Sequence, residues 1–248
     1  MSRPDNEDWY SRTAGHHLIV MRSGYCSMCG RFTLRSNARE IAKQFSVGLD
    51  TLEPRYNIAP AQTVPVIRRQ DDVRQIAMLR WGLIPSWADD PKIGYRLINA
   101  RAETVADKPS FRSAFKRGRC LIVADGFYEW QKDGTKKQPY FIRLKSDQPF
   151  AFAGLSERWQ RGEEIIESCT IITTEPNELT AQVHDRMPVI LPPNQYDLWL
   201  DNEFQGKEKL LSMLKPYPAE EMIAAPVSTL VNSPRNNDPK CIEALIET

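Results

Sequence analysis

Three polar residues have the types and the surroundings that proton-transfer chemistry requires. His184 is the one histidine beyond residue 17, and it lies in a predicted loop between a helix and a strand. A histidine changes its charge near neutral pH, which suits acid and base catalysis, although a hydrogen-bonded scaffold role fits the position equally well. Glu129 follows an apolar strand among aromatic residues; it is a proton donor if it faces inward, because burial disfavours the charged carboxylate, and a salt-bridging surface residue if it faces outward. Asn99 follows two apolar residues and is either a hydrogen-bonding site residue or a turn former.

The chain has five cysteines, and this odd number argues against a secreted disulfide framework and favours a reducing cytoplasm. Cys26 and Cys29 have the spacing of a zinc-ligand pair, but no second pair lies near them, so we expect no metal. A redox role would need this pair to open a helix between two strands, which the region does not resemble. On its own, Cys29 is most simply a small buried residue. We expect no organic cofactor either.

A basic segment interrupts a chain that is otherwise almost neutral. The sequence has 33 basic and 32 acidic residues, so any binding to nucleic acid must come from a local patch. Residues 92–119 hold eight basic residues against two acidic ones, interleaved with or next to Trp81, Trp87, Tyr95 and Phe111. This pattern favours a groove that follows phosphates and stacks bases over a simple solvated face. The basic residues are Lys92, Arg96, Arg101, Lys108, Arg112, Lys116, Arg117 and Arg119.

The composition predicts one packed domain. Hydrophobic residues make up 41% of the chain and charged residues 26%, close to the average of globular proteins. No stretch approaches the roughly 18 apolar residues of a membrane helix. Residues 1–28 are polar and lack periodicity, so we expect a weakly ordered leader that is absent or removed in the active form. The domain is expected at 29–240, followed by a short tail at 241–248.

The elements that must position these residues are mostly short strands, without regular alternation of strand and helix. We therefore expect an α+β fold with a mostly antiparallel, barrel-like sheet and short flanking helices. Ser36 is the expected N-cap of a helix that ends at Phe45. Strands are expected at 63–68, 73–81, 120–124, 127–131, 140–144, 150–154, 169–174 and 188–191, and further helices at 111–117, after Pro176, after Pro193 and at 208–214.

Six sequence blocks follow one another along the chain: Met28–Phe32, Arg55–Pro60, Trp81–Pro85, Ile98–Thr104, Ala124–Trp130 and His184–Pro188. In this order they resemble the SOS-response-associated-peptidase (SRAP) family. The likeness extends from Met28 to about Asn237, nearly the whole chain after the leader. One such block is a weak signal, whereas six in order are highly specific.

The resemblance implies a single α+β domain that binds single-stranded DNA and covalently captures abasic sites in the DNA damage (SOS) response. The family's nucleophile is the cysteine directly after the initiator methionine, which corresponds to Cys29. Its active-site asparagine, glutamate and histidine correspond to Asn99, Glu129 and His184. The implied activity is crosslinking to abasic DNA of a lyase type, together with an (auto)peptidase hydrolase activity.

The resemblance also implies a DNA-binding surface. Arg31 and Arg101 match arginines of the family's phosphate-binding groove, and Pro60 lies in a loop that lines the same site. With Trp81 and Trp87 from the basic segment, these are the residues expected to contact DNA. The expected partner is single-stranded DNA with abasic sites. The protein itself is expected to be a monomer in the cytoplasm, associated with the nucleoid when it binds DNA.

The chemistry of an abasic site fits an amino-terminal cysteine. The ring-opened sugar exposes an aldehyde, with which the α-amine condenses to a Schiff base. The thiol then adds to the same carbon and closes a five-membered thiazolidine, for which Glu129 would assist Schiff-base formation, His184 ring opening and reversal, and Asn99 hydrogen bonding. Cys29 as written is internal and has no free amine. Either translation starts at Met28, which is then removed, or the protein cleaves its own chain before Cys29; we favour the first route.

Two other functions compete with this interpretation. A thiol peptidase with Cys29 as nucleophile, His184 as base and Asn99 as orienting group needs no free amine. A non-covalent single-strand-binding module would use only the basic segment, so its binding would depend on salt and ignore Cys29.

Overall fold

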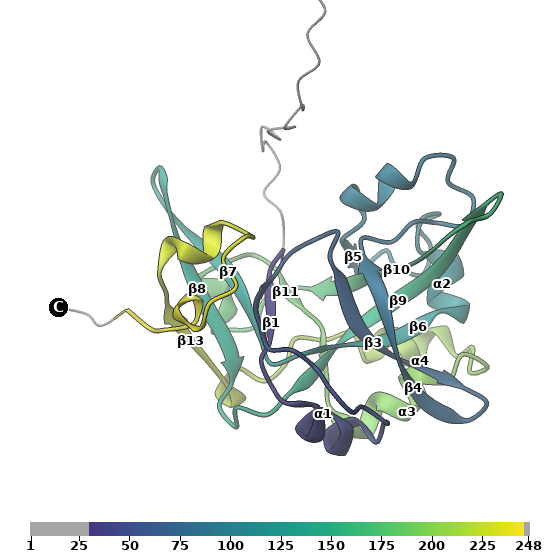
Figure 1. Ribbon diagram of the computed structural model, residues 1–248, viewed down its shortest axis with the longest axis horizontal. Helices are drawn as coiled ribbons and strands as arrows, with labels where there is room; N and C mark the ends of the chain where they lie inside the picture. Colours follow the sequence, from purple (N-terminus) through teal and green to yellow (C-terminus); the bar gives the residue numbers. More distant parts are fainter. Residues whose placement is uncertain (1–29, 246–248) are drawn as a thin grey trace, which may run out of the picture.

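Five strands close into a barrel (Figure 1). The structure is a computed structural model, and it describes residues 30–245, so that Cys29 and the predicted leader lie outside the described residues. The ring closes because β10 pairs with β4 on one side and with β9 on the other. Its pairing with β4 is parallel, and all other pairings in the ring are antiparallel. The expected mostly antiparallel, barrel-like α+β fold is confirmed. In ring order the strands are β10 (Glu164–Thr174), β4 (Val73–Trp81), β3 (Thr63–Gln70), β6 (Arg119–Ala124) and β9 (Phe150–Arg161).

A second, antiparallel sheet lies beside the barrel (Figure 1). Asp125 is the single residue between β6 of the barrel and β7 of the second sheet. Its buried carboxylate accepts hydrogen bonds from the Thr33 hydroxyl (2.6 Å) and from the backbone amides of Arg35 (2.6 Å) and Ser36 (2.7 Å). This carboxylate therefore holds the segment from Thr33 to Ser36 at the junction of the two sheets. The second sheet has the order β13 (Met222–Pro226), β8 (Lys136–Leu144), β7 (Gly126–Asp133), β1 (Phe32–Leu34) and β2 (Arg55–Ile58).

Short strands extend one end of the barrel, and the helices are small. None of the helices within residues 30–245 is long and apolar enough to cross a membrane. The short strands are β5 (Asn99–Arg101), β11 (Met187–Pro188) and β12 (Ile190–Leu191). The α-helices are α1 (Ala38–Phe45), α2 (Arg112–Arg117), α3 (Tyr196–Leu200) and α4 (Lys207–Ser212), and the 3-10 turns are η1 (Pro91–Arg96), η2 (Thr180–Gln182), η3 (Pro193–Gln195), η4 (Ala219–Glu221), η5 (Thr229–Asn232) and η6 (Pro239–Cys241).

Two helix expectations were wrong in detail. The N-cap of α1 is Asn37, which forms a capping box with Glu40, because the Ser36 hydroxyl is already bound to the Asp125 carboxylate. The helix expected after Pro176 is only the 3-10 turn η2. The segment has room for one turn, because β11 begins at Met187 and must pair with Thr174 of β10.

The C-terminal residues stay packed on the domain beyond position 240. Cys241 is fully buried in a small apolar cluster with Tyr128 and Val231. Ala244 forms a β-bridge with Val227. The packing thus shows no break at the boundary expected between the domain and a tail.

Two glycines let a long loop fold back on itself at the start of the region that holds the candidate site. Gly82 has a φ of +127°, a conformation that side chains rarely adopt, and a Cβ there would lie 2.6 Å from the Gly94 carbonyl oxygen. A Cβ at Gly94 would lie 2.7 Å from the Gly82 carbonyl oxygen. The loop between them carries Trp87, so this backbone contact positions an exposed aromatic residue.

We predict that Gly82→Ala lowers the free energy of unfolding by about 2–4 kcal/mol, because it combines backbone strain with a clash against main chain. Urea unfolding measures the change. Gly48→Ala is the control, since a Cβ at Gly48 meets nothing within 4 Å, and it should stay within about 0.5 kcal/mol of the parent protein. Equal effects of the two substitutions would contradict the role given to the glycine pair.

Candidate functional site

The three predicted polar residues lie on segments that meet at one end of the barrel. Asn99 is the first residue of β5, and it pairs with Ile171 of the parallel strand β10. His184 lies between η2 and β11, which pairs with the last two residues of β10. Glu129 lies in the middle of β7 and is 1% exposed. β5 and β11 therefore hold Asn99 and His184 near the same end of β10.

Hydrogen bonds connect the strand of Glu129 to both the His184 segment and the start of the described chain. The Gln131 side-chain amide of β7 donates to the Gln182 carbonyl (2.8 Å), two residues before His184. On the other side, the Tyr128 backbone amide donates to the Arg31 carbonyl (3.0 Å). The first described residues thus run alongside the strand that carries Glu129. Because Glu129 is only 1% exposed, its carboxyl is a buried group and not a surface one.

His184 has two close polar neighbours at one of its ring nitrogens. The Arg186 backbone amide donates to Nδ1 (3.1 Å), and an Asp185 carboxylate oxygen lies 3.1 Å from the same nitrogen. A neutral imidazole that accepts at Nδ1 carries its proton on Nε2. The two neighbours follow His184 directly in the chain, so the local segment fixes the position of the ring.

An ion pair connects the Asn99 segment to the His184 segment. The Arg186 guanidinium donates to both carboxylate oxygens of Glu103, over 2.5 and 3.0 Å, and to the Thr173 carbonyl of β10 (2.7 Å). These hydrogen bonds hold the pKa of the Glu103 carboxyl below its usual range. Glu103 and Arg186 both belong to sequence blocks quoted above, but no role was predicted for either residue.

Arg31 and Asn57 fasten the C-terminal loop to the edge of the second sheet. The Arg31 guanidinium donates to the Asn57 side-chain oxygen (2.7 Å) and to the carbonyls of Val231 (2.6 Å) and Asn232 (3.1 Å). The buried Asn57 amide donates to Val231, Ser233 and Asn236 carbonyls. Burial lowers the pKa of Arg31. Arg31 was expected to contact DNA, and in the structure it also anchors the C-terminal loop. Asn57 has the same anchoring role, and its one signal in the sequence was its place within a quoted block.

The two tryptophans proposed as DNA contacts have opposite positions. Trp87 is 55% exposed, whereas Trp81 is 1% exposed. The Trp81 ring packs edge-on against Phe32, with ring centroids 5.1 Å apart, and its Nε1–H donates to the Ile98 carbonyl (2.9 Å). The expectation that Trp81 contacts DNA directly does not fit this burial. Its side chain instead supports the backbone next to Asn99.

Pro60 and Arg101 lie close to these supports in the fold. Pro60 is half-buried and precedes Ala61, whose backbone amide donates to the Trp81 carbonyl (2.8 Å). Arg101 is exposed at the end of β5, where it pairs with Thr173 of β10. Arg101 is thus accessible on the same strand as Asn99.

The basic segment does not form one surface. Arg119, counted in it above, is fully buried, and its guanidinium donates to five backbone carbonyls, of Phe115, Lys116, Trp199, Asp201 and Phe204. A guanidinium used in this way holds loops together and cannot meet a phosphate. The remaining basic residues of the segment are exposed.

No group of three or more histidine, cysteine, aspartate or glutamate side chains within residues 30–245 is arranged to hold a metal ion.

Comparisons with known proteins agree on one family. A family model described as SOS response associated peptidase (SRAP) matches residues 28–234. The abasic site processing protein YoqW of Bacillus subtilis is 49% identical over 223 residues, which cover 88% of this chain and 100% of that protein. The abasic site processing protein HMCES of Xenopus tropicalis is 37% identical over 232 residues, which cover 80% of this chain and 68% of that protein.

The fold has a solved counterpart. A crystal structure of a protein from Bacteroides thetaiotaomicron matches with a TM-score of 0.80 and 29% sequence identity, covering 88% of this chain and 100% of that one. The solved structure thus has the same overall fold over most of this chain.

We predict that Glu103→Gln lowers the free energy of unfolding at pH 7 by up to about 1 kcal/mol, a value limited by the exposure of the carboxylate. Because the folded pKa of Glu103 is below its usual value of 4.5, the ion pair stabilises the protein above that pH and its contribution is lost as the pH falls through the folded pKa. Urea unfolding from pH 7 to about pH 3 should show the difference from the parent protein shrinking to zero. A difference independent of pH, or an equal one for the exposed Glu164→Gln, would contradict this role.

Proposed function

Because the chain belongs to the SOS response associated peptidase family, we propose that it processes abasic sites in DNA and captures them covalently on single strands through Cys29. The carrying observation is that the segments of Asn99, Glu129 and His184 meet where the described chain begins, one residue after Cys29. The names of the relatives, abasic site processing proteins, support the same substrate.

The proposed reaction uses both nucleophiles of an amino-terminal cysteine. Near neutral pH a part of its α-amine and of its thiol is in the nucleophilic form. The amine adds to the aldehyde carbon of the opened sugar, and loss of water gives a Schiff base. The thiol then adds to the same carbon while the C=N double bond becomes single and the thiol proton passes to the nitrogen, which closes a thiazolidine ring. An internal cysteine cannot complete this sequence because its nitrogen is part of an amide.

The buried carboxyl and the imidazole supply the protons. Loss of water requires a proton on the departing hydroxyl group, a role that suits Glu129 because its carboxyl is shielded from solvent. Opening of the sugar requires a proton on the ring oxygen and the loss of the proton of the C1′ hydroxyl group. His184 would donate the first in its imidazolium form and, once neutral, accept the second. Asn99 would hydrogen-bond the opened sugar or the thiazolidine. The return of the same protons would reverse the link.

The amine of Cys29 must be released before the reaction. The family match begins at Met28, directly before Cys29. This start supports synthesis from Met28 and removal of that methionine. Cleavage of a longer chain before Cys29, assisted by Glu129 or by the cysteine itself, leads to the same amino terminus.

The exposed aromatic and basic side chains around β4 and β5 suit a single strand. Trp87 offers an open ring for base stacking, and the Arg80 guanidinium lies over the Tyr95 ring, 5.1 Å from its centroid, which pairs an aromatic face with a positive charge. Arg101 is exposed two residues after Asn99, and in this proposal it contacts a phosphate next to the abasic sugar.

We predict that Trp87→Ala weakens binding of undamaged single-stranded DNA about tenfold, since base stacking on an aromatic ring contributes ~1–3 kcal/mol, while its thermal unfolding is unchanged. Fluorescence anisotropy at one fixed salt concentration measures the affinity. Trp81→Ala is the contrasting variant, because it removes a core side chain and should lower the free energy of unfolding by about 3–5 kcal/mol. A Trp87→Ala protein that binds like the parent would remove this residue from the proposed DNA surface.

We predict that Cys29→Ala abolishes the denaturation-resistant adduct with an abasic single strand, because neither the thiol nor the thiazolidine remains. A denaturing gel of protein mixed with abasic or undamaged oligonucleotide measures the adduct. Cys120→Ala is the matched control, a buried cysteine of the barrel that the chain from Cys29 onward retains, and it should leave the adduct unchanged.

Three results would contradict the proposal. A persistent adduct in Cys29→Ala would exclude the thiazolidine. Cleavage of peptide substrates by the parent protein without any DNA adduct would favour the thiol peptidase. Equal, salt-sensitive binding of abasic and undamaged strands without an adduct would favour a non-covalent binding module.

A further inference from the structure

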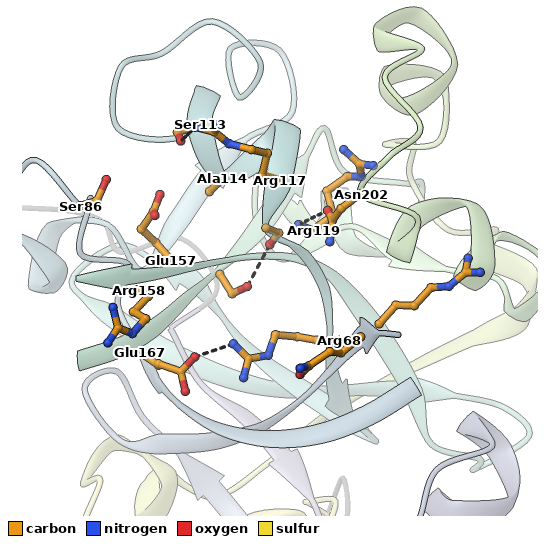
Figure 2. A pocket seen from close by; sticks show the side chains of 14 residues that line it. Arg68, Ser86, Ser113, Ala114, Arg117, Arg119, Glu157, Arg158, Glu167 and Asn202 are labelled. Atoms are coloured by element: carbon orange, nitrogen blue, oxygen red, sulfur yellow. Dashed lines mark hydrogen bonds and ion pairs between the residues drawn. The ribbon is translucent and has the colours of Figure 1, made fainter. Parts of the chain in front are cut away.

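An arginine-lined cavity of about 600 Å³ lies away from the candidate site, with none of the predicted site residues in its wall (Figure 2). Its charged side chains come from β3, α2, β9 and β10. We call it the arginine pocket, and define it by Arg68, Arg69, Arg117, Arg158, Glu157 and Glu167.

The cavity lies where the hairpin of β3 and β4 separates from the hairpin of β9 and β10. β3 pairs with β6 only at Val66 and Ile67, and β10 pairs with β4 only at Ser168 and Cys169. Beyond these positions the ends of the two hairpins diverge, and the Arg68 guanidinium contacts the Glu167 carboxylate (2.6 Å) across the space between them. Figure 2 shows this ion pair at the cavity.

The end of α2 forms another side of the cavity, and two hydrogen bonds hold it against β9. Ser156 donates to the Gly118 carbonyl from its amide (2.6 Å) and from its hydroxyl (3.1 Å). A Cβ at Gly118 would lie 2.1 Å from the Ser156 carbonyl oxygen, so only glycine permits this approach. The contact fixes Arg117, the neighbour of Gly118, at the cavity.

The charges of the pocket are not balanced within it. Arg119 contributes to the wall, but its guanidinium is used by backbone carbonyls. The four other arginines face two glutamates, which leaves two positive charges. Arg68 is paired with Glu167, and Arg69 is paired with Asp72, an exposed carboxylate that water also solvates. Arg117 and Arg158 hydrogen-bond the uncharged side chains of Ser113 and Gln160.

We propose that the arginine pocket binds a phosphate monoester, carried by a free mononucleotide or by the end of a nucleic-acid strand. The positive excess of the wall suits such a group, which carries a charge of about −1.5 to −2 near neutral pH. Guanidinium groups recognise its oxygens through paired hydrogen bonds. A volume of about 600 Å³ is within the ~300–1,000 Å³ range of small-molecule sites. The polar, positively charged wall disfavours an apolar ligand or a cation.

The test is calorimetric titration of the full chain with thymidine 5′-monophosphate, and with thymidine as the uncharged counterpart. We expect the monophosphate to bind and thymidine not to bind. Arg117→Gln and Arg158→Gln should each weaken binding about tenfold, because each removes a charged hydrogen bond. Glu157→Gln should strengthen binding several-fold, since it removes a negative charge from the wall while keeping its shape.

Arg112→Gln is the matched control, an exposed arginine of the same helix that does not line the cavity, and it should leave the affinity within about twofold of the parent value. No binding of the monophosphate or of inorganic phosphate, or an equal loss in Arg112→Gln, would overturn the proposal. Two arginine variants on separate elements keep the test decisive if one of them fails to fold.

Competition with oligonucleotides identifies the source of the phosphate. Displacement of the monophosphate by a 5′-phosphorylated single strand, but not by the same strand with a 5′-hydroxyl, assigns the pocket to strand ends. Displacement by neither strand assigns it to free nucleotides. Equal displacement by both would place the monophosphate on the proposed DNA surface and overturn the separate site. The adduct with Cys29 is measured independently, so this result does not depend on the proposed function.

Discussion

The candidate site depends on the hydrogen bonds of one strand, β10. This strand pairs with β9 along its length, with β4 in parallel, and near its end with β5 and β11. Buried hydroxyl groups add to these contacts: the Ser168 hydroxyl accepts from the Ile84 amide (2.8 Å), and the Thr174 hydroxyl donates to the Leu214 carbonyl (3.2 Å). Because the pairing partners are fixed residue by residue, Asn99 and His184 have little freedom to shift relative to each other.

Arginine has three separate uses in this nearly neutral chain. Arg119 holds backbone carbonyls in the interior, and Arg31 does the same for the C-terminal loop. Arg186 joins two segments of the candidate site through Glu103. Arg117 lies at a cavity with an excess of positive charge. A count of charges along the sequence cannot separate these uses, since each depends on which groups the fold places around the guanidinium.

The sequence predicted local features well. The strands expected at 63–68 and 73–81 are confirmed and form a hairpin, with positive φ at Asp71 and Asp72 in its turn, and the helix expected at 111–117 is confirmed as α2. The family resemblance is also confirmed. These features rest on neighbouring residues or on several motifs in order, so a linear reading is sufficient to find them.

Features that depend on distant partners were missed. Trp81 and Trp87 lie only six residues apart, yet Trp81 is buried and Trp87 is exposed. The reason is that Trp81 is the last residue of a barrel strand, whereas Trp87 lies in the loop that follows it. The cap of α1 moved from Ser36 to Asn37 because Asp125, far along the chain, occupies the serine. The helix expected after Pro176 is only a single 3-10 turn, because the chain must reach the pairing of β11 with β10.

The proposed function requires that an amino-terminal Cys29 forms the link to the abasic sugar. The intact mass of native protein after reaction with an abasic oligonucleotide of known mass tests this requirement. We expect one product, whose mass equals the chain from Cys29 to Thr248 plus the oligonucleotide minus one water. An adduct that retains residues 1–28, or native protein that begins at Cys29 and forms no adduct, would contradict it.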